Sequence, residues 1–295
     1  MRLVKQIRDD KPLRESFLEL AVRVFDLSFK DWYENGFWKD TYLPYSMVEE
    51  GKVVSNASVN VMDMEWKGSR KRCIQIGTVM TDPAYRNLGL SRRLIQEIIK
   101  DWKGSCDCLY LFANDTVLDF YPKFGFVREK EYQHILKAEA CESDFVRLEM
   151  DRKEHRNLVK RCYEKGNPFS DFQMRENEGL LMFYCAGVLK DCVYYSPSLD
   201  CVCIAEKEGE KIYLDDLFGA PGVSLETAVS RIVGTLQARE STVCLGFTPT
   251  EEAGAGCRFE SVMEKEESDV TLFLLEGKEN LLAGQKMMFP ELSHA

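Results

Sequence analysis

The stretch from residue 53 to residue 113 constrains the fold most, because its hydrophobic period changes twice. Residues 53–66 alternate with a period of two, and a polar turn leads into a second strand-like run at 73–80. Apolar residues then recur at helical spacing over 90–102, and residues 108–113 are apolar throughout. Hairpin strands, a helix and a buried strand in this order predict an α/β fold, with a mixed sheet covered by helices.

The 295 residues are enough for two domains of ordinary size. The first, residues 1–140, opens with a short strand and a helical pattern that starts at Pro12, and it ends with a short helix at about 116–121 and a strand from Phe126. The second, residues 141–295, begins within a charged, helical connection between the halves at 138–167. Its predicted strands are 180–186, 191–195, 201–205, 211–217, 242–247 and 270–275, with a helix at 224–238. This order resembles that of the first half, so we interpret the second half as a diverged repeat of the same fold.

Composition and targeting signals favour a soluble, cytoplasmic protein that does not enter a membrane. The longest apolar runs are far shorter than the roughly 20 residues of a membrane span, and residues 1–10 lack the apolar block of a signal peptide. The eleven cysteines include no Cys-x-x-Cys pair, and the three histidines are scattered. We therefore expect reduced thiols and no metal site.

The acidic charge of the chain is concentrated in its second half. Residues 1–140 carry 22 basic and 21 acidic side chains, whereas residues 141–295 carry 17 and 28. Nucleic-acid binding requires a concentrated basic face, so we expect no nucleic-acid partner. An acidic surface favours a cationic substrate, although in many acidic proteins the charge serves only solubility.

The loop between the strand at 73–80 and the helix at 90–102 has the features of a phosphate site. A helix N-terminus offers unpaired N–H groups and the positive end of the helix dipole. Gly89 leaves room for a pyrophosphate near the backbone, Ser91 keeps the wall small, and Arg86 adds positive charge with Arg92 and Arg93. The alternative is an ordinary turn glycine beside a solvated, basic helix face.

Two motifs in this region resemble the GNAT superfamily of acetyl-CoA-dependent N-acyltransferases. The family signature, Gln/Arg-x-x-Gly-x-Gly/Ala, is matched by residues 86–91 with one departure, Ser91 in place of Gly or Ala. A second landmark follows about thirty residues later, as Asn114 and then the run Phe120-Tyr121-Pro122-Lys123-Phe124-Gly125-Phe126. The resemblance covers residues 1 to about 137.

The resemblance implies a role for each matching position. Acetyl-CoA would be the cofactor and CoA the product. The backbone of Val79, Met80 and Thr81 would pair with the pantetheine arm, and Asn114 would contact that arm or orient the thioester. The pyrophosphate would be held by Arg86 and by the loop and helix N-terminus formed by Asn87, Leu88, Gly89, Leu90, Ser91 and Arg92.

Tyr121 would protonate the departing CoA thiolate. A phenol with a pKa near 10 is protonated at neutral pH and can donate a proton. The alternative for Tyr121 is a core aromatic residue at helical spacing with Val117 and Leu118.

Three features remain open at this stage. The general base could be reached through water or lie in the second half, since Gln75, Thr78 and Asp82 only occupy the strand where some relatives carry a carboxylate. The second-half loop at 217–224 lacks the phosphate signature, so that half is expected to bind no CoA and to shape the acceptor pocket. Some tandem members of the family place their C-terminal carboxylate in the active site, and the apolar tail at 287–295 could do so here. The alternative is a strand packed on the core with a frayed end.

The leading hypothesis is direct transfer of an acetyl group from acetyl-CoA to a primary amine, without a covalent enzyme intermediate. Cysteines 73, 106 and 108 lie in strand patterns with no histidine nearby in the sequence, which disfavours a thiol intermediate. The rival functions are a non-catalytic acyl-CoA sensor or scaffold and a purely structural interaction protein. The acceptor stays unassigned among small-molecule and peptide amines, and the oligomeric state is also open.

Overall fold

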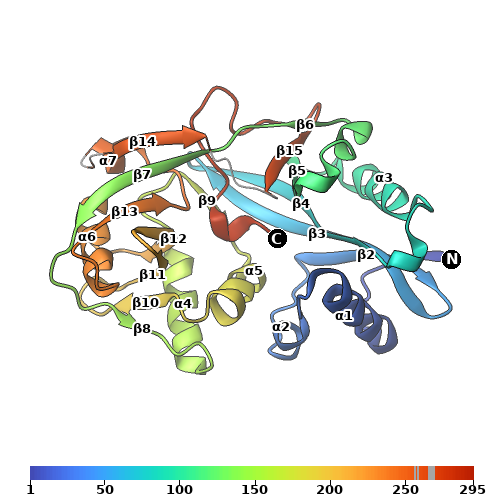
Figure 1. Ribbon diagram of the computed structural model, residues 1–295, viewed down its shortest axis with the longest axis horizontal. Coiled ribbons are helices and arrows are strands. Elements are labelled where there is room, and N and C mark those ends of the chain that lie inside the picture. The colour runs from blue at the N-terminus through green and yellow to red at the C-terminus, as the bar shows by residue number, and fades with distance from the viewer. Residues whose placement is uncertain (256, 258, 265–269) are drawn as a thin grey trace.

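The computed structural model describes residues 1–255, 257, 259–264 and 270–295, with side chains left undescribed at 259–264. Within these residues the chain forms two mixed sheets with helices packed on them (Figure 1). The α/β class expected from the sequence is therefore confirmed. Within the described residues, no helix has both the length and the apolar character needed to cross a membrane.

The first sheet has eight strands among the described residues, one of which, β9, pairs with β3 outside the main order. In spatial order its other strands are β1 (Arg2–Lys5), β2 (Tyr42–Glu49), β3 (Lys52–Trp66), β4 (Ser69–Thr81), β5 (Cys108–Ala113), β15 (Thr271–Leu275) and β6 (Phe126–Arg128); β9 is Phe172–Arg175. Strands β4 and β5 are parallel, and the crossover between them is helix α3 (Leu90–Trp102).

Helices cover both faces of this sheet. Helix α3 buries Leu90, Leu94, Ile95 and Ile98 against one face. On the opposite face lie α1 (Lys11–Phe25) and α2 (Lys30–Glu34), the second of which the sequence patterns did not predict (Figure 1). The N-terminus of α1 is fixed by Asp10, whose side chain accepts a hydrogen bond from the Leu13 amide at 3.1 Å, and by Pro12 in the first turn.

The second sheet has seven strands among the described residues. In spatial order they are β14 (Phe259–Glu264), β7 (Tyr132–Glu139), β13 (Glu240–Leu245), β12 (Lys211–Gly219), β11 (Cys201–Glu208), β10 (Val193–Ser196) and β8 (Val146–Arg147). Strands β12 and β13 are parallel and are joined through helix α6 (Leu225–Thr235), just as β4 and β5 are joined through α3. Helices α4 (Lys153–Lys165), α5 (Glu178–Phe183) and α7 (Glu251–Ala255) complete this half.

Each sheet takes strands from the other side of the predicted boundary at residue 140: the first takes β9 and β15, and the second takes β7. Strand β15 lies between β5 and β6 in the first sheet, and β7 lies between β13 and β14 in the second. A single core cluster also joins the halves, with Tyr110 of β5, Val159 of α4 and Phe218 of β12 among its members. The division at residue 140 and the repeat remain predictions.

Two local predictions were wrong. Residues 180–186 form not a strand but the end of α5 and a following π-helical turn (Tyr184–Val188), because Asn177 caps the helix by accepting a hydrogen bond from the Leu180 amide. A short, wholly apolar run cannot distinguish a buried helix from a buried strand. The helix expected at 116–121 is two 3-10 turns, Asp115–Val117 and Tyr121–Phe124, with Pro122 inside the second.

Candidate active site

The site begins where β4 and β5 separate. Their pairing runs from Cys73 and Cys108 to Ile76 and Leu111, and ends there although β4 continues to Thr81. At the same point the register between β4 and β3 shifts, and Thr78 adopts a left-handed backbone conformation with φ of 47°. The β4 backbone beyond Ile76 is therefore paired with β3 on one side and faces a cavity on the other.

A buried polar network holds the β4 backbone in place at this shift in register. The amide of Asn56 donates to the Thr78 carbonyl oxygen at 3.1 Å, and the Tyr42 hydroxyl donates to Thr78 Oγ1 at 3.0 Å. Ser58 donates to the Tyr42 hydroxyl in turn, at 2.9 Å. Burial raises the pKa of Tyr42 to about 12, so this hydroxyl keeps its proton and its role as a donor.

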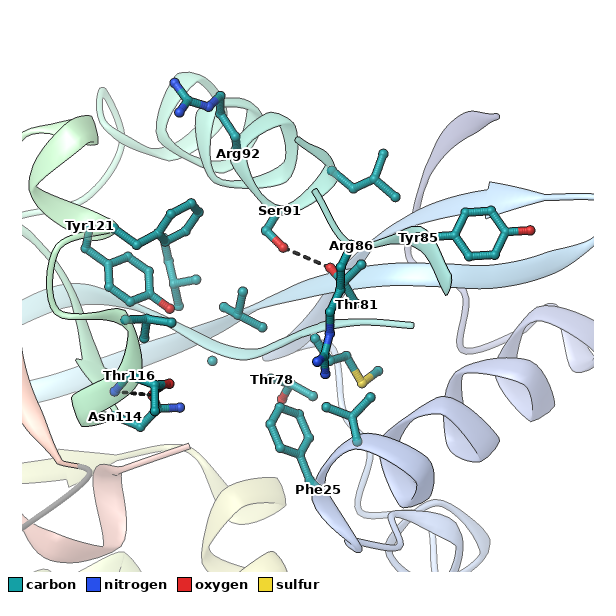
Figure 2. Close-up of a pocket in the computed structure, with 18 of the residues that line it drawn as sticks. Phe25, Thr78, Thr81, Tyr85, Arg86, Ser91, Arg92, Asn114, Thr116 and Tyr121 are labelled. Carbon is teal, nitrogen blue, oxygen red and sulfur yellow. Dashed lines mark hydrogen bonds between the residues drawn. The ribbon is translucent and has the colours of Figure 1, made fainter. Parts of the chain in front are cut away.

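The cavity between the separated strands has a volume of about 920 Å³ (Figure 2). It brings together eleven of the twelve residues predicted for the site: Val79, Met80, Thr81, Arg86, Asn87, Gly89, Leu90, Ser91, Arg92, Asn114 and Tyr121. Leu88 is the exception; it is 61% exposed and does not line the cavity. Their individual roles remain predictions.

The N-terminus of α3 opens into this cavity without a side-chain cap. Its N-cap is Gly89, with φ of 73°, so no side-chain oxygen satisfies the first-turn amides. A Cβ built on Gly89 would meet no atom within 4 Å, so the space beside the backbone is open. The Ser91 hydroxyl is tied to Thr81 Oγ1 at 2.9 Å, which turns it toward β4 (Figure 2). Arg86 is exposed and has no ion-pair partner among the described residues.

Tyr121 and Asn114 stand at the β5 side of the cavity. The Tyr121 side chain is 5% exposed, and its hydroxyl points into the cavity (Figure 2). Burial raises its pKa to about 12. Asn114 Oδ1 accepts a hydrogen bond from the Thr116 amide at 3.1 Å, which leaves the Asn114 amide hydrogens for another acceptor.

Ala295, the last residue of the sequence, also lines the cavity. Its carbonyl oxygen accepts a hydrogen bond from Gln75 Nε2 at 3.3 Å. Gly77 permits this approach, because a Cβ at that position would lie 2.2 Å from the Ala295 oxygen. Figure 1 shows the C-terminus in the middle of the molecule, between the two sheets.

The tail that carries Ala295 is fixed to both halves. The Glu291 amide donates to the Gly246 carbonyl oxygen of the second half at 2.7 Å, and the Tyr110 hydroxyl of β5 donates to the Ser293 carbonyl oxygen at 3.4 Å. Phe289 stacks on Tyr110 with ring centroids 4.2 Å apart. The tail thus packs as a buried coil and 3-10 turn rather than as a strand.

Gln75, Thr78 and Asp82, the residues at the strand where some relatives carry a carboxylate, differ in their surroundings, and the Gln75 amide cannot take a proton. Gln75 is buried beside Ala295, and Thr78 is held by Tyr42. Asp82 lies outside the cavity, where it pairs with Arg23 and caps a 3-10 turn through the Ala84 amide. The sequence patterns did not predict the close contact between Gly77 and the tail, because no local pattern indicates it.

Comparisons with known proteins agree with this geometry. The sequence model of the family described as an acetyltransferase (GNAT) domain matches residues 10–128. No curated protein matches the chain in sequence. Among solved structures, the chain resembles a probable N-acyltransferase from Enterococcus faecalis, with 13% identity, a TM-score of 0.61, and coverage of 93% of this chain and 72% of that one.

Two further structures are similar over most of the chain. A GCN5-related N-acetyltransferase from Kribbella flavida has 18% identity and a TM-score of 0.56, covering 92% of this chain and 70% of the other. Eis1 from Mycobacterium abscessus has 14% identity and a TM-score of 0.54, covering 92% and 73%. At these identities the structures show only that the fold is shared. The family is indicated by the sequence model, which matches residues 10–128. Residues 10–128 of this chain form a GNAT acetyltransferase domain.

Proposed function

We propose that the protein transfers an acetyl group from acetyl-CoA directly to a primary amine, with no covalent enzyme intermediate. One observation carries this proposal: the uncapped N-terminus of α3, the free edge of β4 and the Tyr121 hydroxyl converge on one cavity. A pyrophosphate, an extended pantetheine amide chain and a thioester need these three features.

The residues present fit a CoA thioester. The first-turn amides of α3 would hold the pyrophosphate, since the space beside Gly89 is open. The Arg86 guanidinium, which lines the same cavity, would add positive charge. The β4 edge from Val79 to Thr81 would pair with the pantetheine amides, and the Asn114 amide would donate to them. When bound, the thioester supplies an activated acetyl group.

Tyr121 is suited to protonate the leaving sulfur. Its raised pKa keeps the phenol protonated at neutral pH, and its hydroxyl faces the cavity. The cysteine thiols near the site are poor nucleophiles by contrast. Cys73 is fully buried in the core, and Cys106 is buried as well, with the pKa of each thiol raised, so the thiolate form is disfavoured. This supports direct transfer over a thiol intermediate.

The general base would act near Ala295, which lies where the cavity meets a second cavity described below. The Gln75 amide donates to the Ala295 oxygen there. The proton that the amine loses on attack would leave from this place, directly to an acceptor or through water. The acidic second half of the chain further favours a cationic amine over a neutral or acidic acceptor.

The experiment is to measure release of the CoA thiol from acetyl-CoA with a panel of primary amines, together with CoA binding by calorimetry. Thiol release that depends on an amine, with an acetylated amine as the second product, is the expected result. Tight CoA binding without turnover on any amine would instead favour a sensor or scaffold. Absence of CoA binding would contradict the proposal altogether.

A further inference from the structure

A second cavity of about 570 Å³ adjoins the first. The two share Phe25, Thr78, Phe112 and Ala295 as lining residues. The second cavity extends away from the loop at 86–91, between α1 and α2 on one side and α5 and the tail on the other. A molecule in it would thus reach the thioester end of the first cavity, at the position an acceptor must occupy.

Seven of the nineteen residues that line this second cavity are aromatic. Phe29 stacks on Phe183 with centroids 5.6 Å apart, and Trp32 meets Tyr42 edge to face at 5.3 Å. Helix α5 is locked to the first half because the indole N–H of Trp32 donates to the Gly179 carbonyl oxygen at 2.7 Å. These rings form a preformed apolar box, which suits a flat or bulky apolar group rather than a flexible polar chain.

Two buried amides at the junction of the cavities have atoms without a hydrogen-bond partner. Gln75 is 1% exposed and its Oε1 is unpaired; Asn60 is 3% exposed and its Nδ2 is unpaired. Both side chains line the second cavity, and Asn60 Nδ2 lies near the Gly77 position beside Ala295. An unpaired buried polar atom costs about 1–3 kcal/mol, so a ligand that pairs them would be stabilised. Gln75 Oε1 would accept a hydrogen bond from an amine N–H there.

The charges around the second cavity oppose an anionic acceptor. Its acidic lining residues are Asp26 and Glu291, and no lysine or arginine occurs among its lining residues within the described part of the chain. A carboxylate carried beside the amine would lose its hydration without gaining a lysine or arginine partner in this lining, where the one titratable base among the described residues is His294, which pairs with Glu291. A cationic ammonium group would meet favourable charge on its approach.

From these observations we infer that the acceptor is a primary amine on an aromatic or bulky apolar body, with no carboxylate beside the amine. The amine would lie at Gln75 and Ala295, and the body would fill the aromatic box formed by Phe29, Trp32, Tyr42 and Phe183. This inference rests on the proposed function, because it names the acceptor class of the same reaction.

The test compares acceptors that differ in one feature. Phenethylamine and phenylalanine share a ring and an amine but differ by the carboxylate, and spermidine carries amines without a ring. We expect kcat/KM for phenethylamine to exceed that for either of the others by about 10-fold or more, the scale that a matched apolar pocket provides. Preference for spermidine, or equal use of phenylalanine, would overturn the inference and leave the proposed function standing. Turnover on other amines of the panel but on none of these three would also overturn the inference, whereas CoA binding without turnover on any amine of the panel would count against the proposed function itself.

Two variants test whether the acceptor occupies the second cavity, one in the aromatic box at Phe183 and one at Phe25, which lines both cavities. Phe183→Ala should raise KM for phenethylamine about 10-fold and leave KM for acetyl-CoA unchanged. Phe145→Ala is the matched control, since Phe145 is buried in the core of the second sheet and lines neither cavity. Phe25→Ala is a second test that does not depend on the core, because Phe25 is 43% exposed at the end of α1. An unchanged KM for phenethylamine in both Phe183→Ala and Phe25→Ala would refute the assignment.

Discussion

The substitution Gly77→Ala should displace the end of the tail and leave the rest of the active site unchanged. The new Cβ would lie 2.2 Å from the Ala295 oxygen and 2.9 Å from its carbonyl carbon. Ordinary contact distances are about 3.5 Å, so Ala295 must retreat by about 1 Å. The backbone at Gly77 is not left-handed, so alanine adds no conformational strain of its own. The strand should remain intact while the terminal residue moves.

A displacement of about 1 Å in a residue that lines the reaction site can cost about 10²-fold in rate, equivalent to about 2.7 kcal/mol in activation free energy. We therefore expect kcat of Gly77→Ala to fall about 10²-fold, with little change in KM for acetyl-CoA or in Tm. Steady-state thiol release and thermal denaturation measure these quantities. Gly104→Ala is the control, since its Cβ would meet nothing within 4 Å.

A double-variant cycle tests whether Ala295 carries the effect. Deletion of Ala295 should itself lower kcat, and Gly77→Ala should then cause little further loss, because the two changes act on the same contact. Wild-type kcat in Gly77→Ala, or an undiminished loss in the deletion background, would refute the reasoning.

Three further predictions concern the cofactor loop, the proton donor and a buried carboxylate. Gly89→Glu should abolish CoA binding in calorimetry, because it fills and charges the phosphate site; unchanged affinity would remove the loop from the site. Tyr121→Phe should lower kcat about 10²-fold with little change in CoA affinity, and the wild-type rate should show no loss from Tyr121 ionisation below about pH 11; full activity would exclude Tyr121 as the acid. Burial raises the pKa of Asp216 to about 7, so this group lowers stability progressively as pH rises from about 4 to 7. Asp216→Asn keeps an acceptor for Asn167 and removes the buried charge, so at pH 8 its free energy of unfolding should exceed that of the wild type by on the order of 2–4 kcal/mol. At pH 4 chemical denaturation should show no such gain. An equal gain at both pH values would contradict the linkage argument.

The first half of the chain could be predicted well because its signals are local. The loop around Gly89 lies between a strand and an amphipathic helix, and both patterns can be read within thirty residues. Tyr121 follows from a motif at fixed spacing, even though the helix expected around it is two 3-10 turns.

The acceptor side of the site depends on contacts that no local pattern contains. Phe183 belongs to an apolar run whose pattern is equally consistent with a strand or a helix. The helix is favoured by the Asn177 cap, and the Asn177 side chain also bonds to Thr41 and to the β3 backbone, which no local pattern predicts. Ala295 reaches the cavity only because residues 110 and 246, far away in sequence, hold the tail. The order of strands at the ends of the two sheets could not be predicted for the same reason, because periodicity identifies a strand but not its partner.

The exchange of β7 and β15 has a consequence for the biosynthesis of the protein. When only the first 140 residues have been synthesised, the first sheet lacks the strand that separates β5 from β6, and β7 has no sheet to join. The gap closes only after residue 275 has left the ribosome, so neither half can complete its fold before the other exists. Such distant pairings slow folding and leave open strand edges in the nascent chain. The two halves are therefore obligate folding partners, and a chain cut at residue 140 should aggregate rather than yield a minimal acetyltransferase.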